Sequence, residues 1–140
     1  MIGVGDIMNS ANVLGACSKS GGVSDWKSLS WLFFTPQGRE FCEKNNFPSL
    51  SMFREMSKEV VEYGIYVDAG NISRINDKDI ALIGNTSAEL TYSGTECIHK
   101  IMLMHGAKVN IRASGYAVIL IVNIGDCEVE IEKDSTVKIL

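Results

Sequence analysis

The chain has 140 residues, of which 46% are hydrophobic and 21% are charged, and its net charge is −4. This composition is too apolar for a disordered protein, and the length suits one domain or a small lobe attached to a second unit. Lys and Arg form no cluster in either half of the chain, which argues against nucleic-acid binding.

Residues 1–23 are rich in Gly, Ser and Asn, and we expect them to form a flexible arm. The run Val13 to Cys17 is similar to a lipoprotein cleavage box, but the segment before it lacks the basic start and unbroken apolar stretch of a secretory signal. No apolar run approaches the roughly 20 residues of a membrane span, so no membrane partner is expected. The chain is therefore expected in the cytoplasm.

Residues 24–64 are expected to form a helical segment. Ser24 or Asp25 can cap a helix over 26–34, whose apolar residues recur at helical spacing. Thr35 and Pro36 are typical of the N-cap and first position of a second helix, which runs to about Asn46. A third helix follows the break at 47–49 and ends at Gly64.

Residues 65–140 show the periodicity of strands separated by glycines. Two kinds of strand alternate along the chain. One kind alternates polar and apolar residues, and the other is almost entirely apolar. The first kind occupies 88–92, 107–113 and 127–132, and the second occupies 80–83, 98–104 and 117–122.

The alternating strands recur at nearly constant spacing. The strand that begins at Ala88 recurs 19 residues later at Ala107 and a further 20 residues later at Cys127. Such repeats are typical of stacked units, and predict an α+β chain in which a small β-solenoid follows the helical segment. An antiparallel β-sandwich or roll, with hairpins at 105–107 and 124–126, is the alternative fold.

Charged residues on the outward face favour the solenoid. In stacked coils with these offsets, Glu89 lies under Lys108 and Lys108 lies under Glu128, while Arg112 lies beside Glu132. Opposite charges on neighbouring strands stabilise a sheet by roughly 0.2–1 kcal/mol per pair. The charge pattern therefore predicts a register as well as a fold.

The apolar strand at the end of the sequence contains Val137, Ile139 and Leu140 and has no capping element after it. Exposed strand edges are normally protected in proteins, so we expect a second copy of the chain to cover this one. The sequence thus predicts a homo-oligomer, with a trimer as the expected form.

Few residues suggest chemistry. His99 and His105 are expected on one side of a single strand together with Cys97, but ligands along one strand lie about 6.6 Å or more apart, too far for one tetrahedral metal ion. They are weak metal candidates, and a small metal-dependent enzyme is the corresponding low-weight alternative. The acidic residues between Asp126 and Asp134 are more typical of a solvated face than of a calcium site. No catalytic or cofactor motif is present, so neither enzyme activity nor a cofactor is expected.

Four aromatic residues gather in the first predicted helix: Trp26, Trp31, Phe33 and Phe34. Such a cluster fits a buried core. It also fits a docking surface for another protein, because Trp and Phe are frequent interface anchors.

The stretch from Trp31 to Cys42, followed by Asn46-Phe47-Pro48 and then by the β repeats, resembles a group of small uncharacterised proteins carried by gut bacteria and their prophages. No activity is established for that group, so the resemblance implies no functional residues. Phage virions use small β-rich subunits in fibres, decorations and tails, so the resemblance implies a place in a virion instead of the cytoplasm if the chain is encoded by a phage. We therefore expect a non-enzymatic structural or interaction protein that self-assembles through its β unit. A cytoplasmic adaptor that binds a protein through the aromatic cluster is the alternative.

Overall fold

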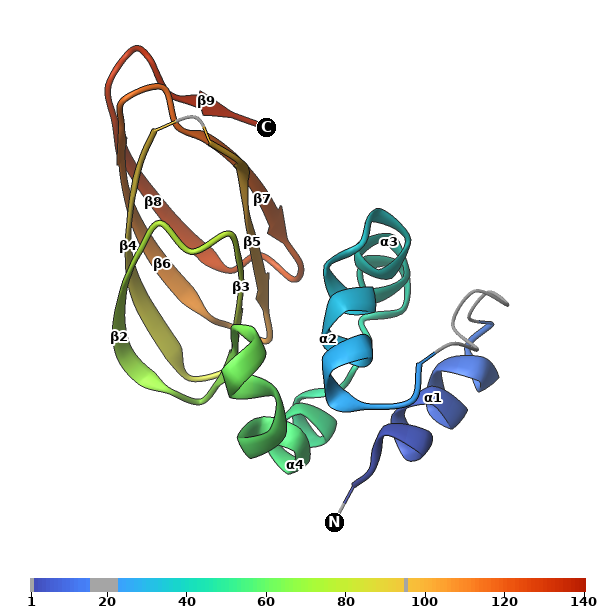
Figure 1. Cartoon of the computed structure of the whole chain (residues 1–140). Helices are drawn as coiled ribbons and strands as arrows, with labels where there is room; N and C mark the ends of the chain where they lie inside the picture. The colour runs from blue at the N-terminus through green and yellow to red at the C-terminus, as the bar shows by residue number, and fades with distance from the viewer. Residues whose placement is uncertain (1, 16–22, 95) are drawn as a thin grey trace. The chain divides into compact units, whose positions relative to one another are not determined.

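A computed structural model describes residues 2–15, 23–94 and 96–140. The chain divides into two compact units, Met1–Ile65 and Tyr66–Leu140. The division lies next to Gly64, which has the left-handed backbone conformation that ends a helix (φ 87°). A helical unit is therefore followed by a β unit (Figure 1).

The helical unit contains the predicted N-caps. Asp25 accepts a hydrogen bond from the Ser28 backbone N–H at 2.8 Å, and the Thr35 hydroxyl accepts one from the Gly38 N–H at 3.1 Å. These caps satisfy N–H groups that have no partner within a helix. The helices that follow are α2 (Trp26–Phe34), α3 (Pro36–Asn45) and α4 (Leu50–Val60), and the 3-10 turn η2 (Val61–Tyr63) continues from α4.

The first helix, α1 (Val4–Val13), lies in the segment that the sequence predicted to be a flexible arm. That prediction is wrong for Val4–Val13. Ile7 and Ala11 lie one helical turn apart and are both buried, and the Gly3 N–H donates to the Asp6 carboxylate at 2.9 Å. Two buried positions are a weak periodic signal, which the polar residues between them obscure. Cys17, the cysteine of the lipoprotein-like box, lies outside the described residues.

The β unit is a parallel β-solenoid, as the sequence predicted. Its strands form two sheets that face each other, and the chain crosses from one sheet to the other at both ends of the strands (Figure 1). The pairs β2–β4, β4–β6, β6–β8, β3–β5, β5–β7 and β7–β9 are all parallel, which excludes the antiparallel roll. The five-stranded sheet contains β1 (Ile65–Val67), β3 (Asp79–Ile83), β5 (Ile98–Met104), β7 (Val118–Asn123) and β9 (Lys138–Ile139). The four-stranded sheet contains β2 (Gly70–Ile75), β4 (Thr86–Ser93), β6 (Lys108–Ser114) and β8 (Glu128–Lys133).

The two kinds of strand seen in the sequence separate into the two sheets. The alternating strands β4, β6 and β8 lie together, so their polar residues form one outer face. The apolar strands β3, β5 and β7 form the centre of the other sheet. Inward side chains of both sheets meet in one core, with Leu90 and Ile111 from one side and Ile101 and Leu103 from the other. The apolar residues of each coil are therefore buried both against the facing sheet and against the neighbouring coils.

The register confirms two of the three predicted charge pairs. Lys108 lies opposite Glu128 with an Nζ–Oε2 distance of 3.7 Å, and Arg112 lies opposite Glu132 with an Nε–Oε2 distance of 3.4 Å. The third pair is wrong, because Lys108 lies opposite Ser87 and Glu89 lies opposite Asn110. The offset between β4 and β6 is therefore 21 residues instead of 19. A shift of two residues keeps every side chain on the same face, so hydropathy does not distinguish the two registers.

Side chains also join the coils at their corners. The buried Thr86 hydroxyl accepts a hydrogen bond from the Ala69 N–H at 3.0 Å and donates one to the Ile83 carbonyl at 2.9 Å. In the same way, the Asp68 carboxylate accepts a hydrogen bond of 2.8 Å from the backbone N–H of Asn85, which lies in the next coil. These bonds satisfy backbone groups where the strand ladders are interrupted.

The stacked core predicts a difference between two isoleucines of one row. Ile111 is fully buried, whereas Ile131, its neighbour in the next coil, is 40% exposed. We expect Ile111→Ala to lower the free energy of unfolding by about 2–5 kcal/mol, and Ile131→Ala by clearly less, because less buried surface is lost. Urea unfolding of dilute protein, followed by circular dichroism, measures both. Equal losses would contradict the stacked core.

Candidate functional site

His99 is buried inside the solenoid and has a defined set of neighbours. Its Nδ1 atom lies 2.9 Å from the backbone carbonyl oxygen of Asp77. A carbonyl can only accept a hydrogen bond, so Nδ1 carries the proton. The ring lies against Tyr92, with ring centroids 4.5 Å apart, and the Cys97 Sγ lies 3.9 Å from Nδ1. His99 is thus held as a core residue that donates to the backbone.

His105 does not share a strand face with His99. The strand β5 ends at Met104, and His105 lies in the following turn with a left-handed backbone (φ 59°). Its equivalents in neighbouring coils are Gly84 and Gly125, which also have positive φ. The placement of both histidines on one side of a strand is therefore wrong. Within residues 2–15, 23–94 and 96–140, no group of three or more His, Cys, Asp or Glu side chains has a geometry that could hold a metal ion.

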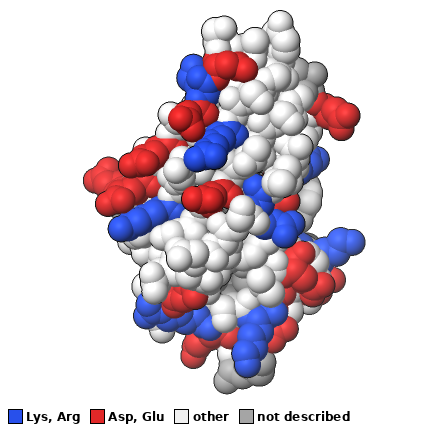
Figure 2. Space-filling view, turned by 90° about the vertical axis from the view of Figure 1, so that its left-hand side faces the viewer, with Lys and Arg blue, Asp and Glu red and all other residues white. Residues whose placement is uncertain are grey.

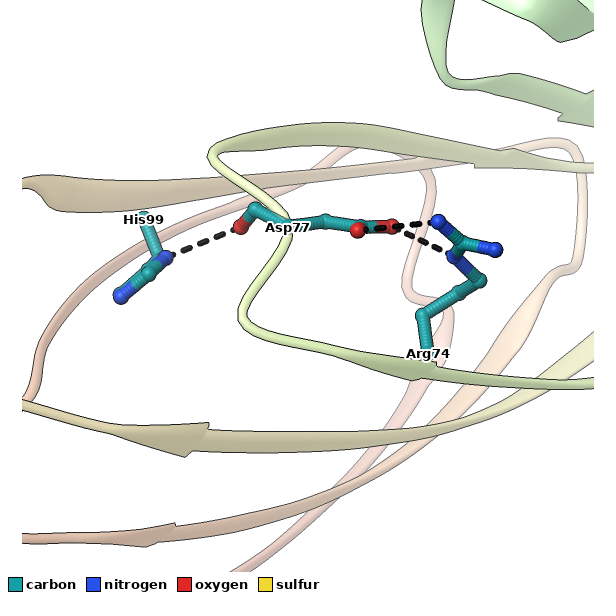
Figure 3. A network of polar contacts seen from close by, with 3 residues as sticks. All are labelled: Arg74, Asp77 and His99. Atoms are coloured by element: carbon teal, nitrogen blue, oxygen red, sulfur yellow. Dashed lines mark hydrogen bonds and ion pairs between the residues drawn. The ribbon is translucent and has the colours of Figure 1, made fainter.

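Asp77 joins His99 to Arg74, and the sequence reasoning missed both Asp77 and Arg74. Figure 3 shows the Asp77 carbonyl directed toward His99 and its carboxylate toward Arg74. The two Arg74–Asp77 hydrogen bonds measure 2.8 and 3.2 Å, the bidentate geometry that Arg favours with carboxylates. Arg74 lies opposite the inward residue Leu90, but its own side chain is 48% exposed. The sequence contained a signal for this pair, because Arg74 occupies a position that is apolar in later coils and Asp77 follows it three residues later.

Tyr92 is the other polar group of this cluster. Burial, and secondarily the charge of Asp77, raise the pKa of the Tyr92 hydroxyl well above its usual value. Its Oη atom is buried, and no described residue forms a hydrogen bond with it. A neutral phenol of this kind is not a nucleophile or an acid near pH 7. The cluster of Arg74, Asp77, Tyr92 and His99 therefore runs from the buried core of the first coils to the surface and offers no evident reaction.

The acidic row on β8 is an outward face. Glu128 and Glu132 are the residues paired with Lys108 and Arg112, and Glu130 lies opposite Asn110. Figure 2 faces the four-stranded-sheet side and shows acidic and basic side chains intermixed there. Exposed pairs of this kind stabilise a protein by about 0–1 kcal/mol each. The acidic row therefore stabilises the register of neighbouring coils, and this role fits it better than the binding of a cation.

The last coil exposes apolar side chains that earlier coils bury. In the inward row Leu90, Ile111 and Ile131, the first two are at most 1% exposed and the third is 40% exposed. Leu140 is 49% exposed, while Ile139 and Val129 are partly buried against the core. We call Val129, Ile131, Ile139 and Leu140 the terminal coil surface. Of the three predicted contact residues at this end, Val137 is instead buried in the core.

The aromatic cluster of the helical unit separates into buried and exposed residues. Phe33 and Phe34 are buried and meet edge to face, with ring centroids 5.4 Å apart. Trp26 is half-buried at the start of α2, whereas Trp31 is 71% exposed. Trp31 is therefore the member of the cluster that is available to a partner.

Of the helices among the described residues, none is both long and apolar enough to cross a membrane.

The contact between His99 and Asp77 predicts a tautomer. At pH 8 we expect the neutral ring of His99 to carry its proton on Nδ1, because that atom faces a carbonyl oxygen 2.9 Å away. Long-range ¹H–¹⁵N correlation spectra of the imidazole rings measure this directly. His105 serves as the internal reference, and a proton on Nε2 of His99 would contradict the buried geometry.

Comparisons with protein-family models, curated proteins and solved structures found no match to this chain. The function is therefore argued from the geometry of the two units. The terminal coil surface and the helical unit are the features that bear on it.

Proposed function

We propose that this chain is a non-enzymatic structural or interaction protein that self-associates through its β unit. The observation that carries the proposal is the terminal coil surface. A further coil stacked on this surface would bury Ile131 as Ile111 is buried, with a gain of roughly 25 cal/mol per Å² of apolar area. A second copy of the chain supplies such a coil.

Charge favours one arrangement of the two copies. Antiparallel pairing of β8 with β8 would set the outward Glu128, Glu130 and Glu132 of one copy against the same residues of the other, which is repulsive. The outward positions of β2 are Asn71, Ser73 and Ile75, none of which is charged. Stacking of β8 on β2 of a second copy therefore avoids like charges and continues the parallel ladder. Such head-to-tail contacts form rings where they close and filaments where they do not.

The setting that we propose follows from the resemblance to proteins of gut bacteria and their prophages. A fibre, decoration or tail part of a virion suits a small β-solenoid that assembles with itself. The genes beside this one test that setting. Neighbouring virion genes would support it, and an isolated gene among metabolic genes would count against it.

Self-association predicts a dependence on Ile131. We expect the native chain to sediment as an oligomer at micromolar concentration, with three subunits as the expected number, and Ile131→Glu to sediment as a monomer, because a carboxylate at the interface would be buried without a partner. Ile98→Glu is the matched control, since Ile98 is 48% exposed but lies in an earlier coil. Analytical ultracentrifugation measures all three. A monomeric native chain, or the same loss in the Ile98 variant, would contradict the proposal.

A second candidate function is protein binding through the helical unit, and the exposure of Trp31 favours it. Interface anchors are enriched in Trp, and its truncation commonly costs 2 kcal/mol or more, roughly a 30-fold loss of affinity. We expect Trp31→Ala to reduce capture of a partner while the circular dichroism of the chain is unchanged. Quantitative pull-down with the native chain and the Trp31 variant tests this, and equal capture by both would exclude Trp31 as an anchor.

A further inference from the structure

The helical unit contains an apolar pocket of about 290 Å³. Its walls come from all four helices and include Ile7 on α1, Phe33 on α2, Phe41 on α3, and Phe53 and Met56 on α4. Ligand pockets in proteins measure about 300–1,000 Å³ and are lined mainly by such side chains. The pocket is therefore at the lower end of the size range for small-molecule sites.

The walls of the pocket are fixed by close packing. Phe33 meets Phe53 edge to face, with ring centroids 5.9 Å apart, and Phe41 meets Phe47 in the same way at 5.8 Å. Gly38 lets α3 approach the end of α2, because a Cβ atom there would lie 2.0 Å from the Leu32 carbonyl oxygen. These contacts fix the helices that line the pocket relative to one another.

Two polar groups lie among the apolar walls. Ser30 is 2% exposed, and its Oγ atom has no hydrogen-bond partner among the residues that the structure describes. Cys42 is also buried, and burial raises the pKa of its thiol to about 12, so it stays uncharged. A buried hydroxyl without a partner costs free energy that a hydrogen-bonding ligand would recover. Ser30 thus marks the point in the pocket where a polar atom of a ligand would be stabilised.

Among the described lining residues, the charged ones lie at the rim of this pocket. Glu40 and Lys44, with Gln37, are exposed residues of α3, and the buried lining residues carry no charge. A charged ligand atom placed deep in the pocket would lack a partner, which is costly. We infer that the pocket binds a small neutral molecule that is mostly hydrocarbon and carries one hydroxyl or carbonyl group, hydrogen-bonded to Ser30.

The size of the pocket supports a ligand of this class. An apolar cavity of about 150 Å³ is sufficient to bind benzene, so 290 Å³ accommodates a larger molecule. A medium-chain alcohol such as 1-octanol has the required composition. This inference concerns the helical unit and does not depend on the self-association proposed for the β unit.

Titration of the full chain with 1-octanol, followed by ¹H–¹⁵N spectra, tests the inference. We expect saturable shifts, and intermolecular nuclear Overhauser effects from the alkyl chain to the rings of Phe33 and Phe53, which locate the site without any substitution. Absence of saturation, or contacts confined to other residues, would overturn the inference. Octanoate at pH 7 should bind more weakly than 1-octanol, and tighter binding of octanoate would overturn the requirement for a neutral ligand.

Substitutions test the role of Ser30. We expect Ser30→Ala to weaken 1-octanol binding about 3- to 10-fold, as the loss of one hydrogen bond does. Ser51→Ala is the matched control, because Ser51 is an exposed helical serine. This variant should bind 1-octanol as tightly as the native chain does. Ala11→Leu adds bulk to the wall and should abolish binding, with circular dichroism to establish that the variant is folded. Native affinity in the Ser30 variant would overturn the assigned hydrogen bond.

Discussion

The stacking of parallel coils is the constraint on which the β unit depends. One coil of about 20 residues cannot enclose its own apolar side chains, so each inward row is buried only when the next coil lies on it. The inward row that contains Leu90 and Ile111 shows this directly, since both side chains are fully enclosed by their neighbours. The outward ion pairs, Lys108 with Glu128 and Arg112 with Glu132, are small terms that agree with the register set by the core.

The same constraint makes the two ends of the solenoid different. At the first coils, a charged residue replaces an apolar one in the inward row, and Asp77 binds both Arg74 and the buried His99. At this end Asp77 therefore joins a half-exposed arginine to a buried histidine. At the last coil, Ile131 and Leu140 remain exposed. An end of this kind resembles the middle of a stack, which is why we propose that a second copy of the chain continues it.

Much of the architecture could be predicted from the sequence, because the period of two residues and the repeat of about 20 residues are both strong signals. The limits had physical causes. The wrong partner for Glu89 arose because a two-residue slip leaves all faces unchanged. His105 was misplaced because the strand ends one residue earlier, at a turn where neighbouring coils have glycine. The helix Val4–Val13 was missed because only Ile7 and Ala11 are buried in it. The pocket in the helical unit arises from the packing of four helices, which no local pattern reveals.

The central claim is that the terminal coil surface is covered by a second copy of the chain. Amide hydrogen exchange over a range of protein concentrations tests it most directly, because the backbone of β8 forms one edge of the four-stranded sheet. The account predicts that protection of the amides of β8 and β2 rises as the protein is concentrated, while that of β4 and β6 is constant. Exchange in β8 that is the same in dilute and concentrated protein would contradict it.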